Sequence, residues 1–125
     1  MTSSYEHRHV EVKAGDQTVA AAEVTLCEQA GGTVRASLYP SSGHVPPGSR
    51  ALLVDSVMDL PEVRASARLE ATVPLGDAEA LQRLRDRTRD AVTRPAGSTA
   101  LVDAAIRAGR QPEPRRGPGG QSALR

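Results

Sequence analysis

The residues best suited to chemistry lie in the stretch 44–50, which reads His-Val-Pro-Pro-Gly-Ser-Arg. It separates an alternating strand pattern from an apolar pattern with helical spacing. The first turn of a helix has free backbone N–H groups, which together with the helix dipole attract phosphates. Gly48, Ser49 and Arg50 open the expected helix and would supply these groups. One interpretation of the stretch is therefore a phosphate-binding turn.

Two neighbouring prolines favour a second, purely structural interpretation of the same turn. Pro46 and Pro47 have no N–H to donate, so two phosphate contacts that such a turn could make are missing. A rigid entry formed by the prolines, a close bend at Gly48 and a cap from the Ser49 hydroxyl explain each residue without a ligand. The sequence favours this structural interpretation.

Histidine and cysteine are too sparse to predict a catalytic or metal site. His7 and His9 share one face of an expected strand, but His44 is the only other histidine. A transition metal needs three or four ligands, which this set does not supply. Cys27 is the single cysteine, and this excludes an internal disulfide. We therefore assign no catalytic residue and no metal ligand from the sequence.

The composition indicates a cytoplasmic protein with a core of small side chains. Its 125 residues fit one domain, and a net charge of +1 gives no general attraction to nucleic acid. No apolar run is long enough to cross a membrane, and the polar N-terminus is unlike a signal peptide. Lys13 is the only lysine among 16 basic residues, which indicates a high-GC, actinobacterial genome. Without Phe or Trp the core buries little area per residue, so we expect a homodimer.

Hydrophobic periodicity predicts a mixed α/β sheet with the element order β-β-β-α-β-α-β. Three alternating segments joined by short glycine-containing turns should form an antiparallel meander. A helix then lies between two strands, so a right-handed crossover should make the third and fourth strands parallel. A second helix, stopped by Pro95 and Gly97, leads to a last short strand near a sheet edge. The expected strands are 8–13, 17–28, 33–39, 67–73 and 98–103, and the expected helices start at 49 and 77.

The expected domain covers residues 8–109. Residues 1–7 are polar and predicted to be flexible, and residues 110–125 are rich in Arg, Pro and Gly with almost nothing to bury. This composition predicts a disordered tail. The arginines of the tail could contact RNA, although no aromatic side chains accompany them for stacking on bases.

The element order and the turn at 44–49 resemble the GNAT acetyltransferase superfamily. In that family the turn has the pattern R/Q-x-x-G-x-G/A, and its backbone N–H groups bind the pyrophosphate of acetyl-CoA. In this chain His44 stands at the first basic or amide position, whereas Pro47 and Ser49 stand at the two glycine positions. The resemblance covers about residues 9–103 and implies a degenerate, truncated member of the superfamily.

A second pattern of that family, N-x-x-A followed by a Tyr that serves as general acid, is met only in part. Asp77 to Ala80 fits the N-x-x-A portion loosely, and Leu84 stands at the Tyr position. The two N-terminal helices that shape the acceptor side in the family have no room in this chain. The residues that the resemblance implies for binding acetyl-CoA or another acyl-CoA are His44, Gly48, Ser49, Arg50 and Asp77.

Three functions remain open on this evidence. The first, which we favour, is a GNAT-like binding or regulatory module for a protein or small ligand, without catalysis or with residual acyl-CoA binding. The second is an atypical acyl-CoA-dependent N-acyltransferase with Glu23 or Glu70 as base; Pro47 and Leu84 argue against it. The third is an RNA- or ribosome-associated protein that uses the arginine-rich tail, which the near-neutral charge disfavours.

Overall fold

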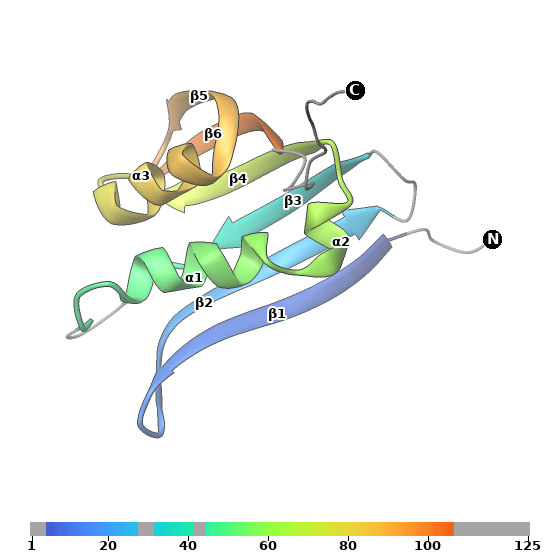
Figure 1. Cartoon of the computed structure of the whole chain (residues 1–125). Coiled ribbons are helices and arrows are strands. Elements are labelled where there is room, and N and C mark those ends of the chain that lie inside the picture. Colours follow the sequence, from blue (N-terminus) through green and yellow to red (C-terminus); the bar gives the residue numbers. More distant parts are fainter. Residues whose placement is uncertain (1–4, 28–31, 42–44, 107–125) are drawn as a thin grey trace, which may run out of the picture.

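A computed structural model describes residues 5–27, 32–41 and 45–106 of the chain. The described strands form one mixed sheet in the order β1-β2-β3-β4-β6-β5, and helices α1 and α3 lie together on one face of it (Figure 1). The strands are β1 (Tyr5–Ala14), β2 (Gln17–Cys27), β3 (Thr33–Leu38), β4 (Arg68–Pro74), β5 (Thr88–Ala96) and β6 (Thr99–Ile106). The helices are α1 (Ser49–Met58), α2 (Pro61–Arg64) and α3 (Ala78–Arg87).

The predicted meander and the predicted crossover are both confirmed. Strands β1, β2 and β3 pair antiparallel in chain order. Strands β3 and β4 pair parallel, with Val34 opposite Leu69 and Ala36 opposite Ala71. The chain between these two strands passes over one face of the sheet as α1 and α2, as expected for parallel neighbours. The predicted fold class, a mixed α+β sheet of GNAT-like order, is therefore correct.

The hydrophobic core lies between the sheet and the helices. Alternate residues of the inner strands point into it, among them Val24, Val34, Leu69, Val73 and Val102. From the opposite side α1 contributes Leu53, Val54 and Val57, and α3 contributes Leu84. Valine, leucine and alanine fill most of this layer, and the core of the described residues contains no aromatic ring. The core thus has the small side chains that the composition predicts.

The segment 88–96 is a strand, not the end of the second helix as the sequence suggested. Helix α3 ends at Arg87 and β5 begins at Thr88, whose hydroxyl donates to the Leu84 carbonyl at 2.7 Å. The segment pairs antiparallel with β6 and gives that strand a second neighbour besides β4. Strand β6 extends to Ile106 and lies between β4 and β5. The last strand is therefore near an edge of the sheet, as expected, but β5 forms the edge itself and β6 is paired on both sides.

Helix α1 begins at Ser49 as predicted, but its cap residue differs from the prediction. Gly48, not Ser49, is the N-cap residue, and its φ of 89° is a left-handed conformation that glycine adopts without steric cost. The side chain of the cap residue makes no hydrogen bond, because glycine has none, and Ser49 already lies within the helix. Beyond the other end of α1, Pro61 opens the short helix α2. Its lack of an N–H costs no hydrogen bond there, because the first N–H groups of a helix have no partner within the helix.

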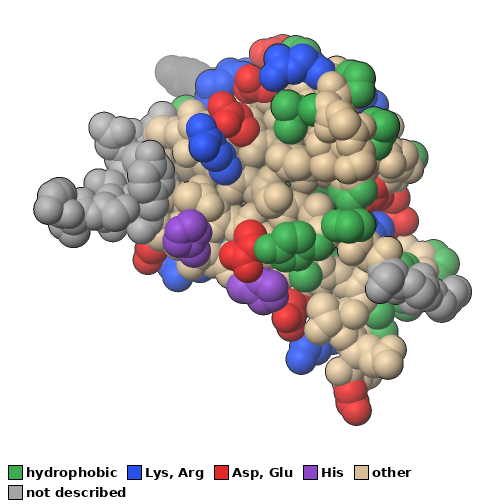
Figure 2. All heavy atoms as spheres, turned by 180° about the vertical axis from the view of Figure 1, so that it is seen from behind, with side chains coloured by type: hydrophobic (Ala, Val, Ile, Leu, Met, Phe, Trp, Pro, Cys, Tyr) green, Lys and Arg blue, Asp and Glu red, His purple; other side chains and the backbone are tan. Residues whose placement is uncertain are grey.

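The face of the sheet opposite the helices, which we call the open face, carries polar and charged side chains (Figure 2). Arg35 on β3 donates through Nε to Oε1 of Glu70 on β4 at 3.1 Å. Arg68 on β4 donates through Nη2 to Oδ1 of Asp103 on β6 at 2.7 Å. These ion pairs connect neighbouring strands on a surface that solvent reaches, so this face is not a second core.

His9 extends the same polar surface to strands β1 and β2. Its Nδ1 lies 2.6 Å from Oε2 of Glu23, and its Nε2 lies 2.9 Å from Oε2 of Glu11. Hydrogen bonds to Glu23 and then to Glu11 raise the pKa of His9 above its ordinary value. A protonated His9 therefore links two carboxylates, which accounts for this histidine without a metal ion.

Several predictions concern the ends of the chain and one loop. Strand β1 begins at Tyr5, so it includes residues 5–7, which composition assigned to a flexible segment. The predicted tail at 110–125 and the loop residue His44 lie outside the described residues. Among the described helices, none is both long and apolar enough to cross a membrane.

Candidate functional site

The candidate site lies where the parallel strands β3 and β4 end and helices α1 and α3 begin. Pairing between the two strands stops at Ser37 and Thr72. Beyond that point the segment after β3 separates from β4 and stays beside β2, where the N–H of Tyr39 donates to the Ala21 carbonyl at 2.9 Å. The carboxyl ends of parallel strands are a common place for ligands in open α/β sheets. Two helix N-termini at this edge give it a positive backbone potential.

Arg50 and Asp77 connect the two helix starts by a largely buried ion pair. Nε and Nη2 of Arg50 lie 2.9 Å and 2.8 Å from Oδ2 of Asp77. The two side chains are only 10% and 11% exposed. Nε makes the hydrogen bond, whereas Nη2 is close in distance but is not aligned for a hydrogen bond with any described residue. The charge of Arg50 is therefore already neutralised within the protein.

Each partner of this ion pair has a second structural contact. Oδ1 of Asp77 accepts the N–H of Ala80 at 3.2 Å, so Asp77 caps α3. Nη1 of Arg50 donates to the Ser41 hydroxyl at 2.8 Å, and that hydroxyl donates to the Val19 carbonyl of β2 at 2.9 Å. The network thus joins α1, α3 and β2 at one edge of the sheet.

Glu79 occupies the N-terminus of α1, where a phosphate would bind. Its Oε2 accepts the N–H of Ala51 at 2.8 Å. The N–H of Ser49 is also engaged, since it donates to the Pro46 carbonyl at 3.2 Å. A carboxylate at a helix N-terminus is stabilised by the dipole, as a bound anion would be. The protein therefore supplies its own anion to the start of α1.

The structure brings together four of the five residues proposed for acyl-CoA binding. Gly48, Ser49 and Arg50 open α1, and Asp77 contacts Arg50 directly. The fifth, His44, lies outside the described residues. Sequence reasoning paired the loop with Asp77 only through the family resemblance, and it assigned no ion pair between Arg50 and Asp77.

Two residues of this network, Ser41 and Glu79, were not identified from the sequence. Glu79 stands in the first turn of α3, where an acidic residue is common for reasons of the helix dipole alone. Nothing in the sequence indicated that its carboxylate reaches the other helix. Ser41 follows a proline in a turn, where serine is ordinary. Both contacts depend on how the two helices sit side by side, which single-sequence patterns do not encode.

The other catalytic and metal candidates find no support in the geometry. Leu84, at the position of the family's general-acid tyrosine, is only 2% exposed and lies in the core. Within the part of the chain that the structure describes, no group of His, Cys, Asp and Glu residues could hold a metal ion. Glu23 and Glu70 both point to the open face and line a cavity there.

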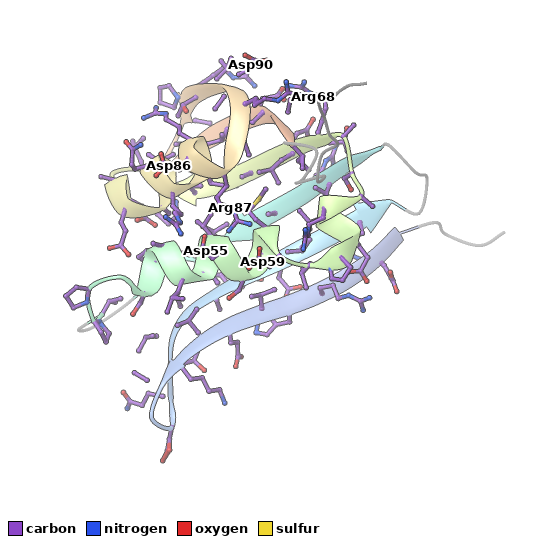
Figure 3. All side chains as sticks on the ribbon, in the orientation of Figure 1. Asp55, Asp59, Arg68, Asp86, Arg87 and Asp90 are labelled. Carbon is purple, nitrogen blue, oxygen red and sulfur yellow. The ribbon has the colours of Figure 1, made fainter. Side chains whose placement is uncertain are left out.

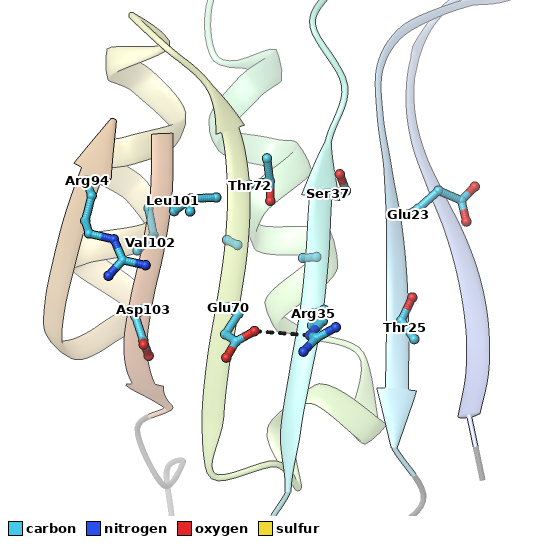
Figure 4. A pocket seen from close by; sticks show the side chains of 12 residues that line it. Glu23, Thr25, Arg35, Ser37, Glu70, Thr72, Arg94, Leu101, Val102 and Asp103 are labelled. Atoms are coloured by element: carbon cyan, nitrogen blue, oxygen red, sulfur yellow. Dashed lines mark hydrogen bonds and ion pairs between the residues drawn. The ribbon is translucent and has the colours of Figure 1, made fainter. Parts of the chain in front are cut away.

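That cavity is about 450 Å³ in volume and lies over the middle strands of the open face (Figure 4). Its floor consists of small side chains, Ser37 on β3 and Thr72 on β4. Charged residues stand around it, including Glu23, Arg35, Glu70, Arg94 and Asp103. The volume is within the range of sites that bind small molecules. The cavity is therefore a second candidate site, on the face opposite the helices.

A further ion-pair network fixes α1 against α3. Arg83 donates to both oxygens of Asp55, through Nε at 2.8 Å and Nη2 at 2.9 Å. Arg87 donates to Asp55 and to Asp59, each at 2.7 Å, and Figure 3 shows Arg87 directed from α3 toward these α1 residues. Two arginines of α3 therefore hold the two helices together.

Solved structures with a similar fold are acetyltransferases. A protein from Sphaerobacter thermophilus DSM 20745, assigned as an acetyltransferase, aligns with 82% of this chain at a TM-score of 0.55 and 12% identity. YncA from Salmonella typhimurium, assigned as an acetyltransferase and solved with acetyl-CoA, aligns with 87% at a TM-score of 0.55 and 12% identity. This chain spans 66% and 69% of their lengths.

No protein-family model matches the chain, and no curated protein matches it. The similarity to solved structures is therefore one of fold alone, because identity is only 12%. The chain shares the fold of these acetyltransferases, and this agrees with the GNAT-like fold that its sequence predicted.

Proposed function

We propose that this chain is a GNAT-fold binding module of the cytoplasm that does not catalyse acyl transfer. The observation that carries this proposal is the Glu79 carboxylate, which accepts the Ala51 N–H at the start of α1. A CoA phosphate at the start of α1 would have to take the Ala51 N–H from the Glu79 carboxylate, and the displaced carboxylate would still lie close to the phosphate. Like charges at such short range disfavour the bound state.

The neighbouring residues add to this effect. Pro46 and Pro47 provide no N–H groups, and the N–H of Ser49 is engaged by the Pro46 carbonyl. The Arg50 guanidinium is paired with Asp77 and is nearly buried, so it contributes little positive charge to an incoming phosphate. A hydrogen bond to a charged group contributes about 1.5–3 kcal/mol. Loss of two such bonds lowers affinity by roughly a hundredfold or more.

A thermal-shift experiment with acetyl-CoA tests the proposal. A competent site stabilises a protein by about 2.7 kcal/mol when the ligand is present at about 100 times Kd. For a chain of this size that corresponds to a rise in Tm on the order of 10 °C. We expect no measurable shift at about 0.1 mM acetyl-CoA, a concentration at which an intact site responds. Release of free CoA in the presence of amine acceptors should also stay at background.

Glu79→Gln is the informative variant, because it removes the charge and leaves an amide oxygen for the Ala51 N–H. We expect it to bind acetyl-CoA several times better than the natural chain, whereas Asp86→Asn, on the exposed side of α3, should change nothing. A strong shift in the natural chain that is lost in Arg50→Gln would restore the acyltransferase alternative.

A further inference from the structure

The cavity on the open face results from a gap between large charged side chains. In the register of the sheet, Ser37 lies opposite Thr72, and Thr72 lies opposite Leu101. In the next row on the same face, two residues along each strand, Arg35 lies opposite Glu70 and Glu70 lies opposite Asp103. Small hydroxyl side chains therefore form the floor, and a row of charges forms one wall. This arrangement gives a polar cavity with an apolar contact at Leu101.

The charges around the cavity are not all neutralised within the protein. Glu23, Glu70 and Asp103 are bonded to His9, Arg35 and Arg68 respectively. Arg94 on β5 also lines the cavity, and it makes no ion pair with any residue that the structure describes. A guanidinium beside a cavity and without an internal partner favours a carboxylate from a ligand, because planar carboxylates match its two parallel donors.

The opposite charge is available on β4. Arg35 bonds to Oε1 of Glu70 through a single N–H at 3.1 Å, and Oε2 has no partner among the described residues. Strands β4 and β5 are separated by β6. Arg94 lies in the row of Leu101 and Thr72, two residues along the strands from the row of Glu70 and Asp103, so the backbones at Glu70 and Arg94 are about 12 Å apart. The Arg94 side chain extends from β5 over β6 (Figure 4), so its guanidinium is nearer to Glu70 than its backbone is.

From these observations we propose that the open-face cavity binds a small amino carboxylate. Its carboxylate pairs with Arg94, its ammonium group pairs with Glu70, and its carbon chain lies over Thr72 and against Leu101. The Ser37 and Thr72 hydroxyls complete the polar contacts. This inference rests on the proposed function, since the ligand is bound and not acylated, but its site lies on the other face of the sheet from the start of α1.

Isothermal titration calorimetry with ω-amino carboxylates of increasing length measures their affinity and tests this site. The probes are glycine, β-alanine, γ-aminobutyrate and 5-aminovalerate, with butyrate and butylamine as the matched compounds that lack one charge. We expect the two longer amino carboxylates to bind at least tenfold more tightly than glycine, butyrate or butylamine. Equal affinity for butyrate would show a simple anion site, and equal affinity for butylamine a simple cation site; each overturns the proposal.

Two variants locate the binding to this cavity. Arg94→Gln and Glu70→Gln should each weaken γ-aminobutyrate binding at least tenfold. Arg89→Gln, an exposed arginine of the same strand that does not line the cavity, should leave the affinity unchanged. Binding that survives Arg94→Gln, or no binding of any probe at about 10 mM, overturns the inference. None of these measurements uses acetyl-CoA. If they fail, the proposal that the chain does not catalyse acyl transfer is unaffected, because the thermal-shift experiment tests it separately.

Discussion

At the residue scale, the ion pair between Arg50 and Asp77 decides what the candidate site can do. A paired, buried guanidinium organises the protein, whereas an exposed and unpaired one would be free to bind an anion. Here the side chains of both partners are about one-tenth exposed, and the second oxygen of Asp77 caps α3. The residue that the family resemblance assigned to the cofactor therefore has a structural role in this protein, although its Nη2 makes no hydrogen bond with a described residue.

The variant Asp77→Asn tests this role. Asparagine keeps an oxygen for the Ala80 N–H, so the cap survives, but the charge on Arg50 loses its partner. Breaking a buried pair in this way is strongly destabilising, and we expect a loss of about 3 kcal/mol in the free energy of unfolding. Urea denaturation measures the loss.

A charge-free pair provides the control for Asp77→Asn. The double variant Arg50→Met with Asp77→Asn removes both charges and should recover most of the lost stability, since hydrophobic replacements of buried ion pairs are often neutral. If Asp77→Asn alone costs less than about 0.5 kcal/mol, the ion pair does not hold the two helix starts together.

At the element scale, the stability of the helix layer depends on Asp55, which receives three hydrogen bonds from α3. The hydrogen bond from Arg83 and then that from Arg87 lower the pKa of Asp55, although partial burial opposes them. A carboxylate whose pKa is lowered by folding stabilises the folded protein at every pH above its pKa in the unfolded chain. This stabilisation is lost as the pH falls through its pKa in the folded protein.

We therefore expect Asp55→Asn to lower the free energy of unfolding by about 1–2 kcal/mol at neutral pH. The expected loss is not larger because the Arg83 side chain is 41% exposed, so that solvent partly screens its charge. The difference from the natural chain should narrow as pH falls below about 4, because this carboxyl group is then protonated in the unfolded chain, while the lowered pKa keeps it ionised in the folded protein until the pH is lower still. Thermal unfolding between pH 3 and 7 measures it. Asp86→Asn, which removes only an exposed contact with Gln82, should have a small effect at every pH. A difference that stays constant down to pH 3 would contradict this account.

The same scale shows how far the sequence could predict the structure. Period-two alternation located β1 to β4, and the rule for crossovers gave the parallel pair β3–β4. Both predictions rest on local patterns with strong physical limits. The segment 88–96 was misassigned because its Asp and Arg residues fit helical ion pairs, whereas its strand depends on pairing with the later β6. The Glu79 contact was missed because it depends on the packing of α1 against α3.

At the scale of the whole molecule, the small side chains of the core leave little stabilising area to a single copy. The core of the described residues is built mainly from Ala, Val and Leu, and β1 and β5 form the two edges of the sheet in the part of the chain that the structure describes. Strand β5 contains Pro95 and a register shift between Arg89 and Val92, and both disfavour pairing with another strand. Strand β1 has ten residues and no proline, and its own register shift lies close to its end, between Val12 and Lys13. The regular stretch from Tyr5 to Val12 is therefore the better edge for a second copy.

We therefore predict a homodimer that forms through the β1 edge. Successive N–H groups of a strand point alternately toward β2 and away from it, so one of Val10→Pro and Glu11→Pro removes only an outward donor. That variant should remain folded and become monomeric, while the other should disrupt the β1–β2 ladder. Light scattering at high micromolar concentration, together with circular dichroism, separates the two outcomes. A monomer mass for the natural chain at that concentration would show that the small core suffices without a partner.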